Sequence, residues 1–323
     1  MGAAIRAVGL TKRYGKTLAV DHIDFDVQEG EIFGFLGPNG AGKTTTTRML
    51  IGISKPTEGT AEILGYDIQK NSVQAKELMG IVPDISNVYT DLSAWENLIF
   101  TGRLYDISKV ERENRAKELL QVFGLFERRK DSVEGFSKGM KRRLCIAMAL
   151  MNKSSILFLD ESTTGLDVQS SLTIRNLVKQ LNAEGLTVFI TTHNMEEANQ
   201  MCDRVAIINN GKIVCIDTPE TLKTTIKKLQ KIEVSFTNPK HNIIADLEML
   251  HEVTDITKNG DKYCINTENV PKLLAEIWNY TILNKLTINT LNTLGPSLQD
   301  VFVELTGIST TTGSCTPKRS TMS

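Results

Sequence analysis

Alternating polar and apolar positions mark the start of this 323-residue chain and predict short β-strands. Apolar-rich segments at 5–10, 18–27 and 31–36 are separated by turns that contain Gly15 and Gly30. In the second segment polar and apolar residues alternate, which is typical of a strand with one buried and one exposed face. The third segment is apolar throughout and predicts a buried strand.

Two short apolar runs further along predict strands that are covered on both faces. They are Ile156-Leu-Phe-Leu159 and Thr187-Val-Phe-Ile190, with a predicted helix over 171–181 between them. Strands that alternate with helices in this way form a mostly parallel sheet flanked by helices. We therefore predict an α/β fold whose N-terminal part also contains β-strands.

The middle of the chain, 93–150, reads as helical. Ser93 precedes Glu96 at the spacing of a capping box, which marks the start of a helix. Residues 108–123 are charged on one face and carry apolar residues on the other: Ala116, Leu119, Leu120 and Phe123.

The pattern changes near residue 225, after a basic stretch at 223–231. We expect a first domain over 1–225, with a helical part at about 85–150, and a small α+β accessory domain over 228–306. Residues 308–323 are rich in Ser and Thr and are expected to form a disordered tail.

Composition narrows the possible functions. With 41% hydrophobic and 23% charged residues the chain is ordinary globular material, and its formal net charge of −1 argues against nucleic acid as the main partner. No apolar run approaches the ~18 residues that cross a bilayer. We expect a cytoplasmic protein that reaches a membrane only through a partner. Five scattered cysteines are expected to be small buried residues, with an exposed thiol in the tail: Cys145, Cys202, Cys215, Cys264 and Cys315.

A glycine-rich loop between the third predicted strand and a predicted helix over 44–51 carries the strongest chemical signal. It fits the pattern G-x-x-x-x-G-K-[ST], which wraps nucleotide phosphates: Gly37-Pro38-Asn39-Gly40-Ala41-Gly42-Lys43-Thr44. The glycines let main-chain N–H groups approach an anion at the start of the helix. Lys43 can reach the β- and γ-phosphate oxygens, and the Thr44 hydroxyl can hold Mg²⁺.

Two further segments carry candidate chemistry. The strand at 156–159 ends in Asp160, placed to bind Mg²⁺, and in Glu161, which could orient or deprotonate an attacking water. Upstream, Ser137 precedes a predicted helix, where its hydroxyl and the first N–H groups form a second anion site. Taken by itself, Ser137 favours the simpler interpretation, the cap of an ordinary helix.

The motifs, in this order and at this spacing, resemble those of the ATP-binding-cassette (ABC) ATPases, the motor subunits of ABC transporters. The resemblance covers residues 4–220 and rests on GPNGAGKTT, FSKGM in place of the signature LSGGQ, LFLDE, GLD, and a lone histidine after a strand. It implies a phosphate-loop ATPase core with an N-terminal antiparallel β subdomain and a helical signature subdomain.

The resemblance also implies a role for each matching residue. Tyr14 would stack on adenine, although an ordinary turn tyrosine is the alternative. Asp167 would lie in the loop that crosses the dimer interface, and His193 would hydrogen-bond the γ-phosphate. Ser137 and Gly139 would contact the γ-phosphate of a nucleotide held by the other subunit. Nine consecutive residues would bind the phosphates: Gly37, Pro38, Asn39, Gly40, Ala41, Gly42, Lys43, Thr44 and Thr45.

The chain departs from the family pattern in three places. Asp84 stands where the family usually has Gln; a carboxylate can bind Mg²⁺ but adds negative charge beside phosphates. Lys138 and Met140 replace residues of the signature, and Ser162 replaces a common proline. None of these changes removes a group that hydrolysis requires.

The function implied is an ATP-hydrolysing subunit of an exporter, with ATP and Mg²⁺ as cofactors. Two copies, or one copy and a similar ATPase, would pair across ATP, and a separate membrane permease would bind near residues 89–96, where Trp95 is either part of that surface or plain core. The ending at 296–307 resembles that of daunorubicin-resistance-type ATPases, and the C-terminal domain is expected to serve regulation or dimer support. Two alternatives are a nucleotide-switched clamp on ribosomes or DNA and a regulatory module without chemistry.

Overall fold

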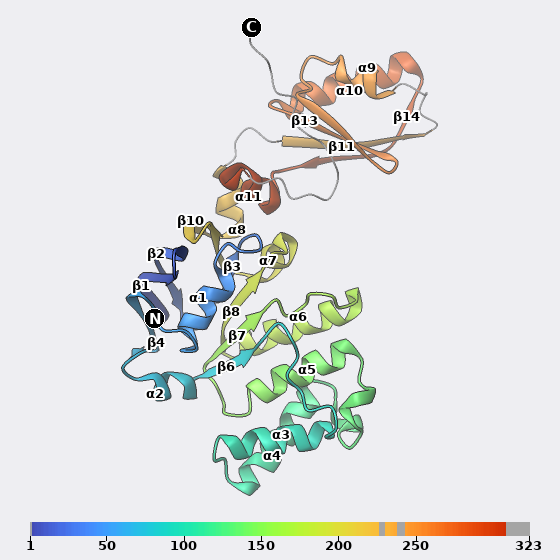
Figure 1. Ribbon diagram of the computed structural model, residues 1–323. Coiled ribbons are helices and arrows are strands. Elements are labelled where there is room, and N and C mark those ends of the chain that lie inside the picture. The colour runs from blue at the N-terminus through green and yellow to red at the C-terminus, as the bar shows by residue number, and fades with distance from the viewer. Residues whose placement is uncertain (1, 226–229, 238–242, 308–323) are drawn as a thin grey trace. The chain divides into compact units, whose positions relative to one another are not determined.

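This computed structural model describes residues 2–225, 230–237 and 243–307, and Figure 1 shows its elements. The chain divides into two compact units, Met1–Pro219 and Glu220–Ser323. The sequence placed domain limits at 225 and 228. Residues 226–229 and the expected tail at 308–323 lie outside the described residues. Within the described residues, no helix has both the length and the apolar character needed to span a membrane.

The first unit is built on a six-stranded sheet in the order β10-β9-β3-β8-β7-β6. Five strands are parallel and β10 runs antiparallel to β9, as the unbroken apolar runs predicted for most of this sheet. The strands are β3 (Ile32–Leu36), β6 (Met79–Val82), β7 (Ile156–Asp160), β8 (Thr187–Thr192), β9 (Arg204–Asn209) and β10 (Lys212–Asp217).

A second, antiparallel sheet carries the alternating N-terminal segments. Its order is β2-β1-β4-β5, with β1 (Ala3–Tyr14), β2 (Thr17–Gln28), β4 (Glu58–Ile63) and β5 (Tyr66–Asp67). The first strand is longer than the predicted 5–10, because the pairing of β1 with both β2 and β4 continues beyond the apolar segment.

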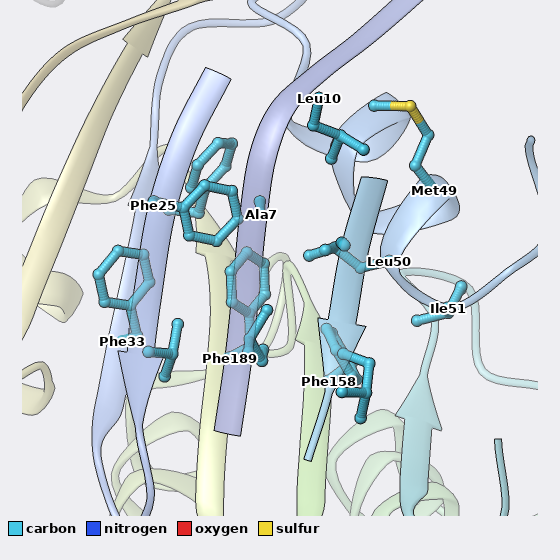
Figure 2. Packing of buried hydrophobic residues seen from close by; sticks show 14 of the residues in the cluster. Ala7, Leu10, Phe25, Phe33, Met49, Leu50, Ile51, Phe158 and Phe189 are labelled. Carbon is cyan, nitrogen blue, oxygen red and sulfur yellow. The ribbon is translucent and has the colours of Figure 1, made fainter. Parts of the chain in front are cut away.

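The two sheets share one core. Phe25 of β2 packs against Phe33 and Phe35 of β3, with ring centroids 5.9 and 5.6 Å apart. Phe189 of β8 joins them and reaches Phe158 of β7 at 5.4 Å (Figure 2). These aromatic side chains bury large apolar areas, so they fix the antiparallel sheet and α1 (Lys43–Leu50) over the strands that carry the phosphate loop and Asp160.

Helices pack around the parallel sheet. The capping box of Ser93 and Glu96 is present at α3 (Ala94–Leu104), as predicted. Helix α3 contacts α4 (Lys109–Val122) and α5 (Lys138–Ala149), and these three gather at one end of the unit (Figure 1). The remaining helical segments are α2 (Ser72–Glu77), η1 (Phe126–Arg128), η2 (Val133–Gly135), α6 (Val168–Ala183), α7 (Met195–Met201) and α8 (Pro219–Thr225), which crosses the division between the units.

The second unit is a four-stranded antiparallel sheet with helices. Its order is β12-β13-β11-β14, and Ile232, Val234 and Ile265 pack with Leu273 and Ile277 in a core of its own. The elements are β11 (Gln230–Thr237), α9 (Ile243–Glu248), β12 (Asp255–Asn259), β13 (Lys262–Thr267), α10 (Val270–Asn284), β14 (Thr287–Leu294) and α11 (Leu298–Thr306).

The cysteines are only partly as expected. Cys145 and Cys202 are buried, whereas Cys215 and Cys264 lie on strands that leave them partly exposed. Cys315, the expected exposed thiol, lies outside the described residues.

Candidate functional site

The glycine-rich loop joins the end of β3 to the start of α1. Gly42 has a φ of 110°, which L-residues with a side chain rarely adopt, and a β-carbon there would lie 2.7 Å from the carbonyl oxygen of Ala19. At Gly37 a β-carbon would overlap the carbonyl oxygen of Ile208. Both glycines are therefore required by the surrounding main chain.

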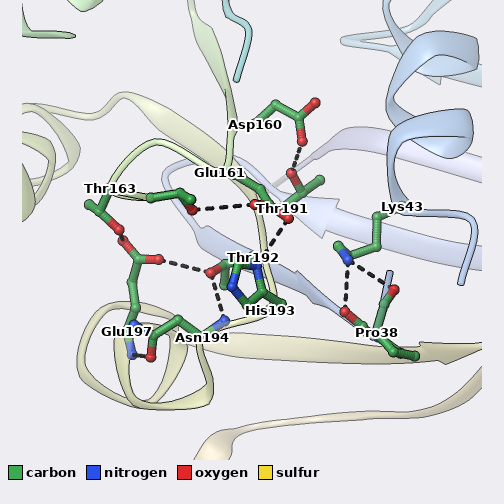
Figure 3. Close-up of polar contacts among 12 residues, drawn as sticks. Pro38, Lys43, Asp160, Glu161, Thr163, Thr191, Thr192, His193, Asn194 and Glu197 are labelled. Atoms are coloured by element: carbon green, nitrogen blue, oxygen red, sulfur yellow. Dashed lines mark hydrogen bonds and ion pairs between the residues drawn. The ribbon is translucent and has the colours of Figure 1, made fainter. Parts of the chain in front are cut away.

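Lys43 lies across this loop. Its side chain is buried (6% exposed), and Nζ donates hydrogen bonds to the carbonyl oxygens of Gly37 at 2.7 Å and Pro38 at 3.1 Å (Figure 3). Burial lowers the pKa of Lys43, and the nearby carboxylates of Glu161 and Asp160 counteract part of this shift. The ammonium group is thus held at the loop, facing the end of β7.

The ends of β7 and β8 bring together residues that are distant in sequence. The two strands pair so that Asp160 lies opposite Thr191, and the Thr191 hydroxyl donates a hydrogen bond to the Asp160 carboxylate. Glu161, one position later, accepts from Thr164 at 3.3 Å and lies 3.1 Å from Nδ1 of His193 (Figure 3). The predicted catalytic carboxylate and the predicted switch histidine are therefore in direct contact.

Thr44, Asp160 and Asp84, the predicted metal ligands, line one cavity of about 620 Å³, together with Asn39 and Glu161. No group of three or more His, Cys, Asp or Glu side chains among the described residues is close enough to hold a metal ion by itself. Mg²⁺ usually takes one or two carboxylates and completes its shell with waters and substrate phosphates. The hydroxyl and carboxylate oxygens present fit that ion in combination with a nucleotide.

Ser137 and Gly139 belong to a different cluster, at the start of α5. Neither lines the cavity of Asp160. The Ser137 hydroxyl accepts a hydrogen bond from the Met140 N–H, and a β-carbon on Gly139 would overlap the side chain of Ser170. Asp167 caps α6 beside them, accepting from Ser170 N at 2.8 Å. Ser137, Gly139 and Asp167, here called the signature cluster, therefore form a site separate from the phosphate loop within a single chain.

Tyr14 lies at the end of β1. Its side chain is 49% exposed, and the Lys12 ammonium lies 5.0 Å from the ring centroid. The hydroxyl oxygens of Tyr14 and Ser54 are 3.5 Å apart. The ring is not part of the core and is accessible for stacking.

Two buried charged residues near the site escaped the sequence analysis. Arg142 of α5 is 3% exposed, and burial lowers its pKa. Glu197 of α7 is 2% exposed and accepts hydrogen bonds from the hydroxyls of Thr163 at 2.6 Å and Thr192 at 2.9 Å. A sequence signal for Arg142 existed, because it shares helical spacing with the buried residues of α5: Gly139, Ile146 and Ala149.

Comparison with known proteins gives consistent results. The family model described as ABC transporter matches residues 20–164. The chain is 37% identical to a linearmycin resistance ATP-binding protein of Bacillus subtilis, over 94% of this chain and 98% of the relative. It is 35% identical to a bacitracin transport ATP-binding protein of Bacillus licheniformis, over 95% of this chain and 98% of the relative.

Solved structures agree. An ATP-binding subunit of an ABC transporter aligns with a TM-score of 0.63 at 27% identity, over 69% of this chain and 92% of that one. A dimeric ATP-binding cassette in a post-hydrolysis state, bound to ADP and phosphate, aligns with a TM-score of 0.59 at 26% identity, over 66% of this chain and 98% of that one.

Proposed function

The chain belongs to the family of ABC transporter ATP-binding proteins, and we propose that it hydrolyses ATP to power export through a separate membrane subunit. The family hydrolyses ATP, and the full-length relatives named for linearmycin resistance and bacitracin transport support export as the purpose. The observation that carries the proposal is the contact of 3.1 Å between Nδ1 of His193 and the Glu161 carboxylate, which also interacts electrostatically with Lys43. None of the relatives reported above is named for a role on ribosomes or DNA.

The phosphate loop would bind the nucleotide. Its main-chain N–H groups and the start of α1 favour an anion, and Lys43 would exchange its loop carbonyls for β- and γ-phosphate oxygens. Thr44 and Asp160 would hold Mg²⁺, and the Thr191 hydroxyl fixes the orientation of the Asp160 carboxylate. Bound there, the ion would supply positive charge against the charge that develops on the phosphate oxygens.

Glu161 and His193 would act on the attacking water. Glu161 accepts a proton from the water as its oxygen bonds to the γ-phosphorus, the bond from that phosphorus to the bridging oxygen breaks, and ADP and phosphate leave. In the imidazolium form, which carries an N–H on both ring nitrogens, His193 would donate a hydrogen bond from Nε2 to the γ-phosphate and keep Glu161 oriented through the contact at Nδ1. The same imidazole ring would thus form hydrogen bonds with both the γ-phosphate and the Glu161 carboxylate.

Asp84 remains a proposed metal ligand. It lines the same cavity as Thr44 and Asp160, which supports a role in holding the ion, directly or through water. Because a carboxylate carries a full negative charge, it would bind the ion more strongly than the usual amide and would repel the phosphates when the ion is absent.

Completion of each site would require a second copy of the chain or a similar ATPase. The start of α5 still offers main-chain N–H groups beside Ser137 and Gly139, which suit the γ-phosphate of a nucleotide on a partner. Tyr14 would stack on the adenine of its own nucleotide, and Asp167 would lie at the interface. ATP would then join two molecules, and its hydrolysis would release them.

The membrane subunit would dock on an apolar groove of about 490 Å³. Its lining includes the exposed side chains of Tyr89, Leu104 and Tyr105, which suit a helix from a partner. Trp95 is half-buried and lines a separate pocket with Glu96, which supports a position at the surface rather than in the core. Docking there would place the protein at the cytoplasmic face of a membrane.

The test of this function is Glu161→Gln. The variant should bind ATP with Mg²⁺ and form an ATP-dependent dimer, measured by light scattering, while phosphate release stops. Continued turnover at the wild-type rate would exclude the role of Glu161, and a wild-type protein that releases no phosphate would exclude the enzyme. A pull-down that recovers ribosomes and no membrane protein would favour the clamp.

A further inference from the structure

The turn that presents Glu161 has an unusual main-chain conformation. Glu161 has a φ of 45°, in the left-handed region that residues other than glycine adopt at a cost in free energy. Its N–H donates to the carbonyl oxygen of Thr191 at 3.0 Å, which holds one side of the turn to β8. A conformation of this kind persists only where the surrounding structure stabilises it.

Arg142 supplies that stabilisation from α5. Its Nη2 donates to the carbonyl oxygen of Asp160 at 2.8 Å, and its Nε donates to that of Ser162 at 2.9 Å. These are the residues immediately before and after Glu161. One planar guanidinium group therefore holds both ends of the left-handed turn, an arrangement that suits its fixed fork of donors.

The third nitrogen of Arg142 holds a second segment. Nη1 donates to the carbonyl oxygens of Pro83 and Asp84, the latter at 3.3 Å, at the end of β6. Within the described part of the chain, no carboxylate lies within ion-pair distance of Arg142. All of these hydrogen bonds go to main-chain oxygens, and the carboxylates of Asp84, Asp160 and Glu197 act on the charge only from a distance, so the hydrogen bonds fix the position of the two segments.

The position of Arg142 connects this clamp to the signature cluster. Arg142 lies in α5, whose first turn is capped by Ser137 and contains Gly139. An α-helix moves as a rigid element, so a ligand that binds and shifts the start of α5 also shifts the guanidinium group of Arg142. Glu197 accepts hydrogen bonds from Thr163 and Thr192, so a second buried charged residue also holds the segments next to this turn.

We propose that Arg142 is a positioning residue, which holds the Glu161 carboxylate in its working geometry and transmits engagement of Ser137 by a partner's nucleotide to that carboxylate. The proposal rests on the proposed function of Glu161. It assigns to Arg142 no contact with ATP, water or metal, so its loss should slow the chemical step and leave nucleotide binding intact.

The variants that test this proposal are Arg142→Lys and Arg142→Gln. Lysine keeps the charge but places its donors on a single nitrogen, which cannot reproduce the fork of three nitrogens that reaches the carbonyl oxygens of Asp160, Ser162 and Pro83 together. The matched control is Arg143→Lys. Arg143 is the next residue and is also partly buried, but it donates to the carbonyl oxygen of Phe123, away from the turn.

We expect Arg142→Lys to lower kcat for ATP hydrolysis at least tenfold, with KM for ATP within twofold of wild type. Arg143→Lys should keep kcat within threefold. In the Glu161→Gln background, Arg142→Lys should still dimerise with ATP. If Arg142→Lys keeps wild-type kcat, or loses ATP affinity in parallel with kcat, the positioning role is wrong.

A second measurement does not depend on activity. Amide hydrogen exchange of a peptide covering 160–164 should become at least tenfold faster in Arg142→Lys and should not change in Arg143→Lys. Equal exchange rates in Arg142→Lys and Arg143→Lys would show that Arg142 does not hold the turn. This comparison still decides the question if Arg142→Gln fails to fold. If the wild-type protein hydrolyses no ATP, the proposed function fails, while this exchange comparison still decides whether Arg142 holds the turn.

Discussion

Replacement of Glu197 by alanine should destabilise the first unit more than any change at the exposed surface of α7. The wild-type carboxylate accepts hydrogen bonds from Thr163 and Thr192 in a site that is 2% exposed. Hydrogen bonds to a charged group contribute about 1.5–3 kcal/mol each, and two hydroxyls lose a partner. Removal of the carboxylate also ends the desolvation cost of a buried charge, which offsets part of the loss. We expect a net loss of about 3 kcal/mol.

The assay is thermal unfolding followed by circular dichroism and by phosphate release at each temperature. For a unit of this size, about 3 kcal/mol corresponds to a lowering of Tm by roughly 6–12 °C. The control is Glu196→Ala, one residue earlier on the exposed side of α7, whose side chain accepts a hydrogen bond from Gln200 at 2.6 Å. That i,i+4 pair contributes about 0.2–0.5 kcal/mol. If the two variants unfold within 1 °C of each other, the hydroxyl network does not stabilise the protein.

Three further predictions concern other parts of the chain. Gly37→Ala should abolish nucleotide binding in a filter-binding assay, because its β-carbon overlaps the main chain, whereas Gly135→Ala, with open space around it, should bind normally. Asp84→Asn should raise the Mg²⁺ concentration for half-maximal ATPase activity at least threefold; an unchanged Mg²⁺ dependence would exclude Asp84 as a ligand. In the second unit, burial raises the pKa of Asp300 but hydrogen bonds from Lys231 and the helix cap outweigh it, so the pKa is lowered overall. Its stabilisation is present above the unfolded pKa of about 3.9 and is lost as pH falls below it. Asp300→Asn should therefore flatten the decline of stability below pH ~4, measured by urea unfolding at several pH values.

Local features of the sequence predicted much of the fold. The capping box of Ser93 and Glu96 is visible because its partners are three residues apart, and the buried face of α4 is visible because Leu119 and Leu120 repeat at helical spacing. The unbroken apolar runs predicted buried parallel strands, because burial on both faces is visible in consecutive residues. The phosphate loop was readable because its geometry depends on glycine at fixed positions, which the main chain around Gly37 and Gly42 requires.

The partners of these elements could not be read in the same way. Periodicity says which face of α5 is buried but not what that face contacts, so no role for Arg142 could be predicted. Only the packing of α5 against the ends of β6 and β7 places its guanidinium group around the turn of Glu161. Glu197 was hidden for the same reason, since its hydroxyl partner Thr163 is 34 residues away.

The sequence by itself predicted which residues carry the chemistry and determined on which local elements they lie, because phosphate-binding loops, helix caps and strand ends depend on neighbours along the chain. The tertiary structure decided the geometry between them. Asp160 contacts Thr191, and Glu161 contacts His193, because β7 and β8 pair in one parallel register. The same register pairs Phe158 with Phe189, whose rings pack in the core between the two sheets. Contacts of this kind form between segments distant in sequence, and no local pattern encodes their alignment.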